Sequence, residues 1–276
     1  MLTPTADIVT NAAAAGRGVG AFNVIQLEHA EALVAAAERA ELPVVLQISQ
    51  NAVRYHGSLT PIGLATLAVA RASSATVAVH LDHATDPELV HDAVELGFTS
   101  VMFDASALSY SDNVDATAAV VDYCRRREVF VEAELGEVGG KDGVHAPGAR
   151  TDPGEAAVFV DRTDVDALAV AVGSSHAMVE RTAALDFELI SRLRAKVMVP
   201  LVLHGSSGVA DDDLVAAVAA GMTKINIATH LNRAFTDAVR EHLAANPSTV
   251  DTRRYLAAGR DAVTAEAARL LRLLAG

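Results

Sequence analysis

The chain has 276 residues, of which 51% are hydrophobic, and it carries a formal net charge of −13 at pH 7. No Lys/Arg-rich run offsets this charge, so the composition excludes nucleic acid as an expected partner. Apolar runs fall short of the roughly 18 residues that a membrane span needs, no export signal is expected at the N-terminus, and the one cysteine fits a reducing compartment, so we expect a cytoplasmic protein.

Short β-branched runs alternate with Ala- and Leu-rich segments of helical spacing along the whole chain. The predicted strands are residues 18–24, 43–49, 76–82, 99–104, 129–135, 166–172, 199–204 and 223–228. The predicted helices are residues 27–40, 60–73, 86–97, 111–127, 154–161, 186–195, 211–220, 230–245 and 257–274. Asp-Pro pairs at 86–87 and 152–153 favour helix starts, and Gly97 and Gly221 favour helix ends.

Eight strands separated by helices over about 250 residues are typical of a (β/α)8 barrel. We therefore predict an α/β fold, a single (β/α)8 TIM barrel over residues 1–276 with additional N- and C-terminal helices. An open doubly wound sheet is the alternative, but it more often has a Gly-rich turn after its first strand, whereas the glycines of "GRGVGAFNV" precede it. The long Gly-rich segment 136–153 is predicted to be a mobile lid.

Polar side chains lie at or just after the ends of the predicted strands. In chain order they are Asn23, Ser49, Asp82, His83, Asp104, Glu134, His176, His204 and Asn226. Because the C-terminal ends of barrel strands converge on one face, we expect these side chains to meet there. Singly, each is more often a capping or solvated residue. Three strand-end histidines with carboxylates on the strands between them make chance a poor explanation.

Three neutral imidazoles with one open position are typical of a catalytic zinc site. Such a metal polarises a carbonyl group, and Asp82, beside His83, could move protons for the substrate. The sequence therefore predicts a metal centre formed by His83, His176 and His204. The histidines in helical or loop patterns are interpreted as surface residues: His29, His56, His91, His145, His230 and His242.

The segments after the seventh and eighth strands read "HGSSGVADD" and "NIATHLN". Gly205 and Gly208 let backbone N–H groups approach an anion, Ser206 and Ser207 add hydroxyl donors, and Thr229 is placed to cap the next helix. Loops seven and eight usually hold phosphate in such barrels. "GSSG" alone is commonly a turn, but beside a strand-end histidine and "NIAT" it favours a phosphate site.

With these motifs the sequence resembles the metal-dependent class II fructose-bisphosphate and tagatose-bisphosphate aldolases. The likeness covers almost the whole chain in order, through "AFNV", "HLDHA", "VMFD", "VEAELGEVGG", "TDP", "DALAVAVGSSH", "LVLHGSSG", "INIAT" and "DTRRYLAAGRDA". The resemblance implies reversible cleavage of a ketose 1,6-bisphosphate to dihydroxyacetone phosphate and glyceraldehyde 3-phosphate. It also implies a phosphosugar as the small-molecule partner, a homodimer or homotetramer, and a monovalent cation (Na⁺ or K⁺) near the phosphate.

The resemblance assigns roles by motif. Zn²⁺ would be held by His83, His176 and His204, with Asp104 and Glu134 supporting an alternative metal position, and Asp82 would exchange a proton with the C4 hydroxyl. Dihydroxyacetone phosphate would be held by Gly205, Ser206, Ser207, Asn226, Ile227, Ala228, Thr229 and the backbone of Ala177. Asn23 and Ser49 would be further substrate contacts, and Arg253 and Arg260 are candidates for the second phosphate.

The sequence also departs from the family pattern. Ala177 stands where Gly is usual, Asp142 stands where the lid generally carries Glu, and "DASALS" replaces the commoner "DGS". Asp142 is therefore the expected lid base, and the preference between fructose, tagatose and another phosphorylated ketose stays open. Three rivals remain: a Schiff-base aldolase, for which Lys224 would lie at the wrong end of its strand, a metal-dependent hydrolase, and a non-catalytic phosphosugar-binding barrel.

Overall fold

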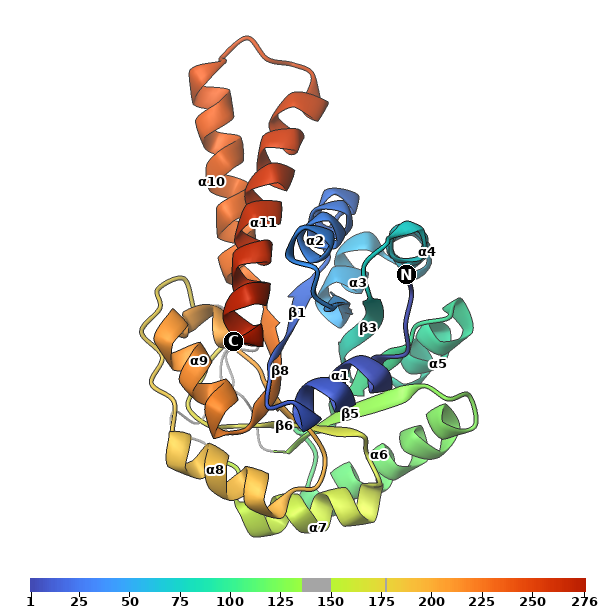
Figure 1. The fold of residues 1–276 in the computed structure, drawn as a ribbon. Coiled ribbons are helices and arrows are strands. Elements are labelled where there is room, and N and C mark those ends of the chain that lie inside the picture. The colour runs from blue at the N-terminus through green and yellow to red at the C-terminus, as the bar shows by residue number, and fades with distance from the viewer. Residues whose placement is uncertain (136–149, 177) are drawn as a thin grey trace.

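The computed structural model describes residues 1–135, 150–176 and 178–276. In these residues eight parallel strands pair in chain order, and β8 pairs with β1, so the sheet closes into a barrel (Figure 1). The predicted (β/α)8 barrel is confirmed. The strands are β1 (Val19–Asn23), β2 (Val44–Ser49), β3 (Val77–Ala84), β4 (Ser100–Phe103), β5 (Phe130–Leu135), β6 (Ala167–Val170), β7 (Leu201–Leu203) and β8 (Met222–Ile227).

Helices surround this barrel. They are α1 (Thr5–Ala14), α2 (Leu27–Ala40), α3 (Gln50–His56), α4 (Thr60–Ala72), α5 (Pro87–Leu96), α6 (Tyr110–Arg125), α7 (Pro153–Thr163), α8 (Phe187–Lys196), α9 (Asp211–Ala220), α10 (Thr229–Ala245) and α11 (Thr252–Ala275). α11 begins before the predicted residue 257 because the Asp251 carboxylate accepts a hydrogen bond from the Arg253 amide at 3.1 Å. The short α3 was not predicted. Its two turns are too few to show a helical period.

The additional N-terminal helix α1 closes one end of the barrel. It contacts β1, β3 and β8 and lies in the middle of the ring of helices (Figure 1). The Thr5 hydroxyl hydrogen-bonds to that of Ser100, the first residue of β4, at 2.7 Å. Val9 is fully buried and clusters with Met102, Phe130 and Val202 from the strands. The N-terminal ends of the strands are thus sealed, and the opposite end remains for a binding site.

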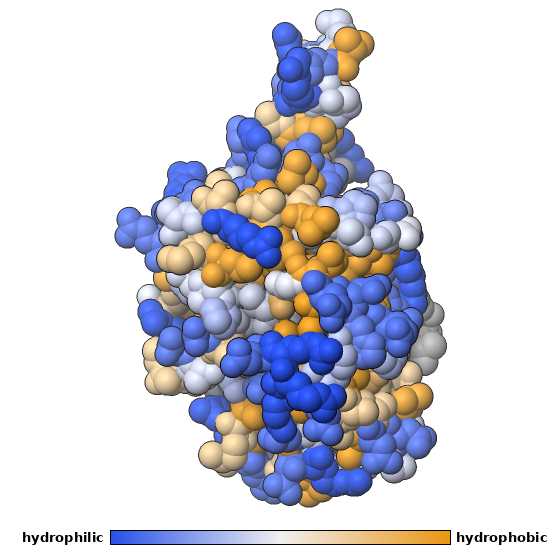
Figure 2. Space-filling view, turned by 90° about the vertical axis from the view of Figure 1, so that its right-hand side faces the viewer, coloured by the Kyte–Doolittle hydropathy of each residue, from blue (hydrophilic) through white to orange (hydrophobic). Residues whose placement is uncertain are grey.

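The additional C-terminal helices α10 and α11 form a hairpin that extends beyond the ring of helices (Figure 1). α11 packs against both α10 and α2. Figure 2 shows the hairpin standing out from the body of the molecule, with apolar side chains gathered on the surface beneath it. Within the described part of the chain, no helix combines the length and apolar character needed to cross a membrane.

Most of the predicted lid, residues 136–149, lies outside the described residues. Its end at residues 150–153 is anchored. The Thr151 hydroxyl donates to the Leu135 carbonyl at the end of β5 and accepts from the Ala171 amide after β6, both at 2.8 Å. Asp152 caps α7 by accepting from two backbone amides. The last residues of the predicted lid are therefore tied to β5, β6 and α7.

Candidate metal centre

The three predicted histidine ligands meet at the C-terminal end of the barrel. His83 belongs to β3, His176 follows β6, and His204 follows β7 directly. The ring centroids of His83 lie 5.1 Å from His176 and 4.5 Å from His204, and those of His176 and His204 are 5.7 Å apart. One ring nitrogen from each residue lies within 4.8 Å of the other two. Side chains far apart in sequence thus form one group that can hold a single ion.

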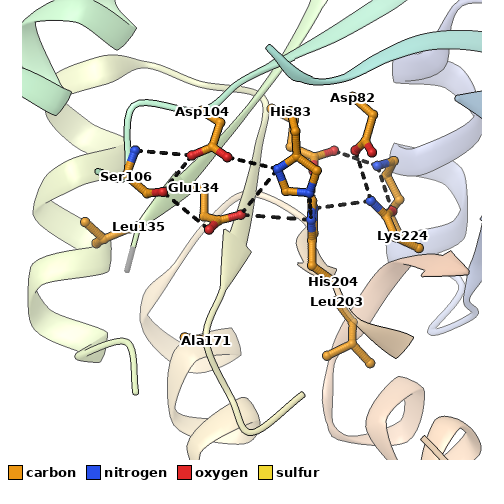
Figure 3. A network of polar contacts seen from close by, with 12 residues as sticks. Asp82, His83, Asp104, Ser106, Glu134, Leu135, Ala171, Leu203, His204 and Lys224 are labelled. Carbon is orange, nitrogen blue, oxygen red and sulfur yellow. Dashed lines mark hydrogen bonds and ion pairs between the residues drawn. The ribbon is translucent and has the colours of Figure 1, made fainter. Parts of the chain in front are cut away.

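Carboxylates fix the orientation of two of these imidazoles (Figure 3). His83 Nδ1 lies 2.9 Å from Asp104 Oδ2, and His204 Nε2 lies 2.8 Å from Glu132 Oε1. An ionised carboxylate only accepts hydrogen bonds, so both of these nitrogens carry the proton. The lone pairs are then left on His83 Nε2 and His204 Nδ1, which face each other at 2.8 Å. Facing lone pairs repel, and a bound cation removes the repulsion. The donor set therefore fits a metal ion.

The backbone at His83 allows two neighbouring side chains to reach the site. His83 has a φ of 53°, and the pairing of β3 with β4 shifts between Leu81 and Ala84. In a regular strand, Asp82 and His83 would point to opposite faces. With this bulge both line the same pocket. A left-handed conformation costs about 1–2 kcal/mol for a residue with a Cβ, and such strain is typical of functional sites.

Asp104 and Glu134 lie beside the histidines, as expected. Both are buried, and one carboxylate oxygen from each lies within 4.8 Å of a ring nitrogen of His83. Glu134 Oε2 is 3.9 Å from both His83 Nδ1 and His204 Nδ1. Ser106 donates its hydroxyl to Asp104 Oδ1 at 2.6 Å (Figure 3). With His83, these acidic groups form a second set of side chains that can hold a metal ion.

Sequence reasoning missed a buried ion pair that supports the site. Lys224 Nζ lies 2.9 Å from Glu132 Oε2, and both side chains are fully buried inside the barrel. Lys224 also donates to Asn226 Oδ1 at 2.9 Å, which turns the amide nitrogen of Asn226 toward Asp82 Oδ1 at 3.4 Å. His80, whose Nε2 lies 3.8 Å from Glu132 Oε2, completes the cluster. The alternation in "VEAELG" puts Glu132 and Glu134 on one face and could have revealed this partner.

The electrostatics favour the protonation states that a metal enzyme needs. Burial lowers the pKa of His204 to about 4, so the imidazole is neutral near pH 7. Burial opposes ionisation of Asp82, but electrostatic interactions with its neighbours, His83 first and the Lys224 ammonium among them, outweigh it and hold its pKa below the usual value. Burial likewise opposes ionisation of Glu132, and Lys224 reverses that effect and lowers its pKa. His204 can therefore serve as a ligand and Asp82 as a proton acceptor.

The centre opens into a polar pocket of about 330 Å³. Predicted site residues that line it are Asn23, Ser49, Asp82, His83, Asp104, His176, Gly205, Ser207, Asn226, Ala228 and Thr229. Lining residues that were not predicted are Gln47, Gln50, Asn51, Arg54 and Thr85. Ser206 and Ile227 are buried beside the pocket, and Arg260 lies outside its lining and donates to Glu31 at 3.0 Å. Asp142 and Ala177 lie outside the described residues.

Ser207 joins the two loops in which the sequence predicts a phosphate. Its hydroxyl accepts from the backbone amides of Ala228 and His230, both at 3.2 Å. The expected cap of α10 is wrong: Thr229 is the first helical residue, and Ser207 of the preceding loop, not Thr229, accepts from the first-turn amide of His230. Gly205 has a φ of +66°, and an added Cβ would lie 2.6 Å from the Ser175 carbonyl carbon. Backbone segments after β6, β7 and β8 therefore approach each other closely here.

The described histidines that were expected on the surface differ in exposure: His56 is exposed, His91, His230 and His242 are half-buried, and His29 is buried. His29 is buried, with its ring edge against Phe235 at a centroid distance of 5.1 Å, and burial lowers its pKa to about 4. His230 is half-buried, and its Nε2 lies 2.6 Å from Glu266 Oε1. Helical spacing does not show which face of α2 is covered, so the surface interpretation is wrong for His29. His145 lies outside the described residues.

Comparison with known proteins identifies the family. The model of the family described as fructose-bisphosphate aldolase class-II matches residues 3–276. The chain belongs to this family. It is 41% identical over 251 residues to a fructose-bisphosphate aldolase of Geobacillus stearothermophilus, which covers 90% of this chain and 88% of that protein. The resemblance read from the sequence is confirmed, and with it the assignment as an aldolase, a carbon–carbon lyase.

Solved structures agree with this assignment. The crystal structure of the YdjI aldolase from Escherichia coli K12 matches with a TM-score of 0.86 and 32% identity, over 99% of this chain and 97% of that one. A fructose-bisphosphate aldolase from Campylobacter jejuni matches with a TM-score of 0.80 over 97% of this chain and 93% of that one. Its identity is 22%, so this second likeness shows the barrel fold alone.

Replacing Glu132 tests the buried support of the candidate metal centre. In Glu132→Gln, we expect metal affinity to fall about 10- to 100-fold, because the partner of His204 is altered. The unfolding free energy should fall by about 3–5 kcal/mol, because Lys224 keeps a buried charge without its partner. Zinc competition titration and urea unfolding of the metal-free protein measure the two effects.

The double variant with Lys224→Met should recover much of the stability but not the metal affinity. Unchanged metal affinity in the single variant would contradict this account.

Replacing Gly205 tests the close approach of the loops. Gly205→Ala should lower the unfolding free energy by more than the roughly 1–2 kcal/mol that a left-handed conformation costs, because its Cβ would also clash with the Ser175 backbone. It should also weaken binding of dihydroxyacetone phosphate. Gly57→Ala is the matched control, since Gly57 has a φ of +75° and no atom within 4 Å of an added Cβ. Equal losses in urea unfolding of the two variants would exclude the clash.

Proposed function

We propose that this aldolase catalyses the metal-dependent, reversible cleavage of a ketose 1,6-bisphosphate, of fructose or tagatose, into dihydroxyacetone phosphate and glyceraldehyde 3-phosphate. The observation that carries the proposal is the pair of lone-pair nitrogens of His83 and His204, directed at each other by their carboxylates, with His176 beside them. Asp82 lies in the same pocket with its pKa lowered. A Lewis acid and a proton acceptor are what an aldol cleavage requires.

Zinc is the metal that we propose, held by His83, His176 and His204. Neutral imidazole donors suit zinc, and three protein ligands leave a position for the substrate. Bound there, the ion would polarise the substrate carbonyl as a Lewis acid. Asp104 and Glu134, which join His83 in the second group of possible ligands, would support an alternative position. A monovalent cation near the phosphate stays a prediction.

Asp82 is the proposed acid–base for the C4 hydroxyl. Its carboxylate accepts the hydroxyl proton as the C3–C4 bond breaks and returns it in the reverse direction. The lowered pKa of Asp82 favours the ionised form that this step needs. Asn226 donates its amide to Asp82 at 3.4 Å and so orients the carboxylate. The proton at C3 would be exchanged by Asp142, whose role on the lid stays a prediction.

The substrate would lie across the pocket. Dihydroxyacetone phosphate would occupy the loops after β7 and β8, which supply Gly205, Ser207, Ala228 and Thr229 to the lining. Ser206 and Ile227 would support these loops from the buried side, and Asn23 and Ser49 would contact the sugar. The phosphate contact of the Ala177 backbone stays a prediction, as does the second-phosphate role of Arg260.

The Schiff-base alternative needs a lysine that can reach the substrate. Lys224 lies in the first half of β8, away from the strand end at the site, as expected, and its ammonium group is buried against Glu132 at 2.9 Å and does not line the pocket. A substrate in the pocket would therefore not reach this amine. The preference between fructose, tagatose and another phosphorylated ketose, the cytoplasmic location and the homo-oligomeric state stay predictions from the sequence.

A coupled triose-phosphate assay tests the reaction. The zinc-loaded protein should cleave fructose or tagatose 1,6-bisphosphate, a chelator should abolish turnover, and added zinc should restore it, because three protein ligands are left without their ion. Borohydride with substrate should not inactivate the protein. Turnover that survives chelation and is lost irreversibly with borohydride would replace the metal mechanism by the Schiff-base one.

Replacing Asp82 tests its role as acid–base. Asp82→Ala should retain zinc and the fold but lose turnover by a factor of order 10²–10⁴, which is the usual contribution of a positioned acid–base. The matched control is Asp86→Ala. Asp86 caps α5 by accepting from the Glu88 amide at 3.0 Å, and it does not line the pocket. Steady-state rates of the two zinc-loaded variants decide the matter, and near-normal turnover without Asp82 would remove it from the mechanism.

A further inference from the structure

The pocket has an uneven distribution of charge. Among the described residues that line it, Arg54 is the only lysine or arginine. The carboxylates of Asp82 and Asp104 also line the pocket, and the chain as a whole carries a net charge of −13. A substrate with two phosphates brings further negative charge into this site. A cation at the pocket wall therefore has a direct electrostatic use.

The lining has two ends that differ in chemistry. The loops after β7 and β8 offer backbone groups and hydroxyls, from Gly205, Ser207 and Thr229. The segment after β2 offers the side chains of α3, including Arg54. In the closed barrel, β8 and β1 separate β7 from β2. A ketose bisphosphate with one phosphate on the β7 and β8 loops and its reacting carbons at Asp82 therefore directs its other phosphate toward α3.

Contacts at the start of α3 fix its position on the barrel. The Ser49 hydroxyl accepts from the Ala52 amide at 3.2 Å and caps the helix. The Gln50 side chain donates to the Thr85 hydroxyl at 3.0 Å and accepts from the Thr85 amide at 2.9 Å. α3 is thereby tied to the loop that follows β3, next to Asp82 and His83. Its first turns form a fixed wall of the pocket.

The guanidinium group of Arg54 is available for an anion. It donates to the neutral amide oxygen of Asn51 at 3.2 Å, and it forms no ion pair with any residue that the structure describes. Its side chain is exposed at the mouth of the pocket. The two candidates from the sequence both lie outside the lining: Arg260 donates to Glu31 at 3.0 Å, and Arg253 donates to Asp251 at 2.8 Å. Of these three arginines, Arg54 alone lines the pocket.

We propose that Arg54 binds the phosphate of the aldehyde half of the substrate and so makes the enzyme select a ketose 1,6-bisphosphate over the ketose 1-phosphate. The inference rests on the proposed function and adds the residue that sets this preference. A guanidinium group presents several N–H donors in a plane that matches two phosphate oxygens, and it keeps its charge at any pH of interest. Ser49, which caps the same helix and also lines the pocket, adds a hydroxyl donor.

Substrate discrimination in Arg54 variants tests this inference. The measured quantity is the ratio of kcat/KM for the ketose 1,6-bisphosphate that is cleaved fastest to kcat/KM for its 1-phosphate. Arg54→Met should lower the ratio about 10- to 100-fold, the usual loss for hydrogen bonds to a charged group. Arg54→Lys, which keeps the charge but not the planar donors, should lower it less. Arg192→Met, at an exposed arginine on α8, is the matched control and should leave the ratio unchanged.

Two further results separate the possible failures. Exchange of the C3 proton of dihydroxyacetone phosphate with solvent in the wild-type zinc protein reports the proposed function without the aldehyde half. If exchange and cleavage are both absent, the proposed function itself fails. If both are present and Arg54→Met keeps the wild-type ratio, the inference is overturned. If Arg260→Met lowers the ratio of kcat/KM values and Arg54→Met does not, the inference is also overturned, and the second phosphate is assigned to Arg260.

Discussion

The proposed metal centre depends on hydrogen bonds from imidazoles to buried carboxylates. Each bond decides which ring nitrogen keeps a lone pair, and those of His83 and His204 direct two lone pairs to one point. A carboxylate buried beneath a metal ligand would gain a proton unless a positive charge stabilised it. Lys224 supplies that charge at 2.9 Å from Glu132. The same ammonium group orients Asn226 toward Asp82, so one buried lysine supports both the proposed metal ligand His204 and the proposed acid–base.

Much of the site could be predicted because the barrel converts sequence position into spatial position. A polar residue at the end of any strand faces the same opening, so His83, His176 and His204 could be grouped before their distances were known. Their separation in the chain, across β3, β6 and β7, carries no information about which ring nitrogen is directed inward. That orientation comes from Asp104 and Glu132, and only coordinates give it. The Glu132 role was missed because Glu132 lies in the middle of β5, whereas the site residues were sought at the strand ends.

Other features escaped prediction for different physical reasons. The bulge at His83 depends on how β3 pairs with β4, and a pattern within one strand does not reveal pairing irregularities. Lys224 lies in the first half of β8, as expected, but its contact with Glu132 on β5 was missed because it crosses the barrel between distant strands. The short α3 has too few residues for a period, although its cap Ser49 was already a candidate contact. Short-range sequence patterns predict most helices and strands. They predict contacts across the barrel only for residues at strand ends, because these residues share one opening.

The architecture separates the chemistry from substrate selection. The metal ligands, Asp82 and the buried pair of Glu132 and Lys224 are fixed by strands whose side chains pack against one another, so a change at any one disturbs the others. α3 stands outside the repeating strand–helix units and presents an exposed arginine to the same pocket. An exposed side chain can change with little effect on stability. A family with this barrel can therefore keep one bond-breaking centre and alter the aldehyde that it accepts by substitutions on a short helix at the rim.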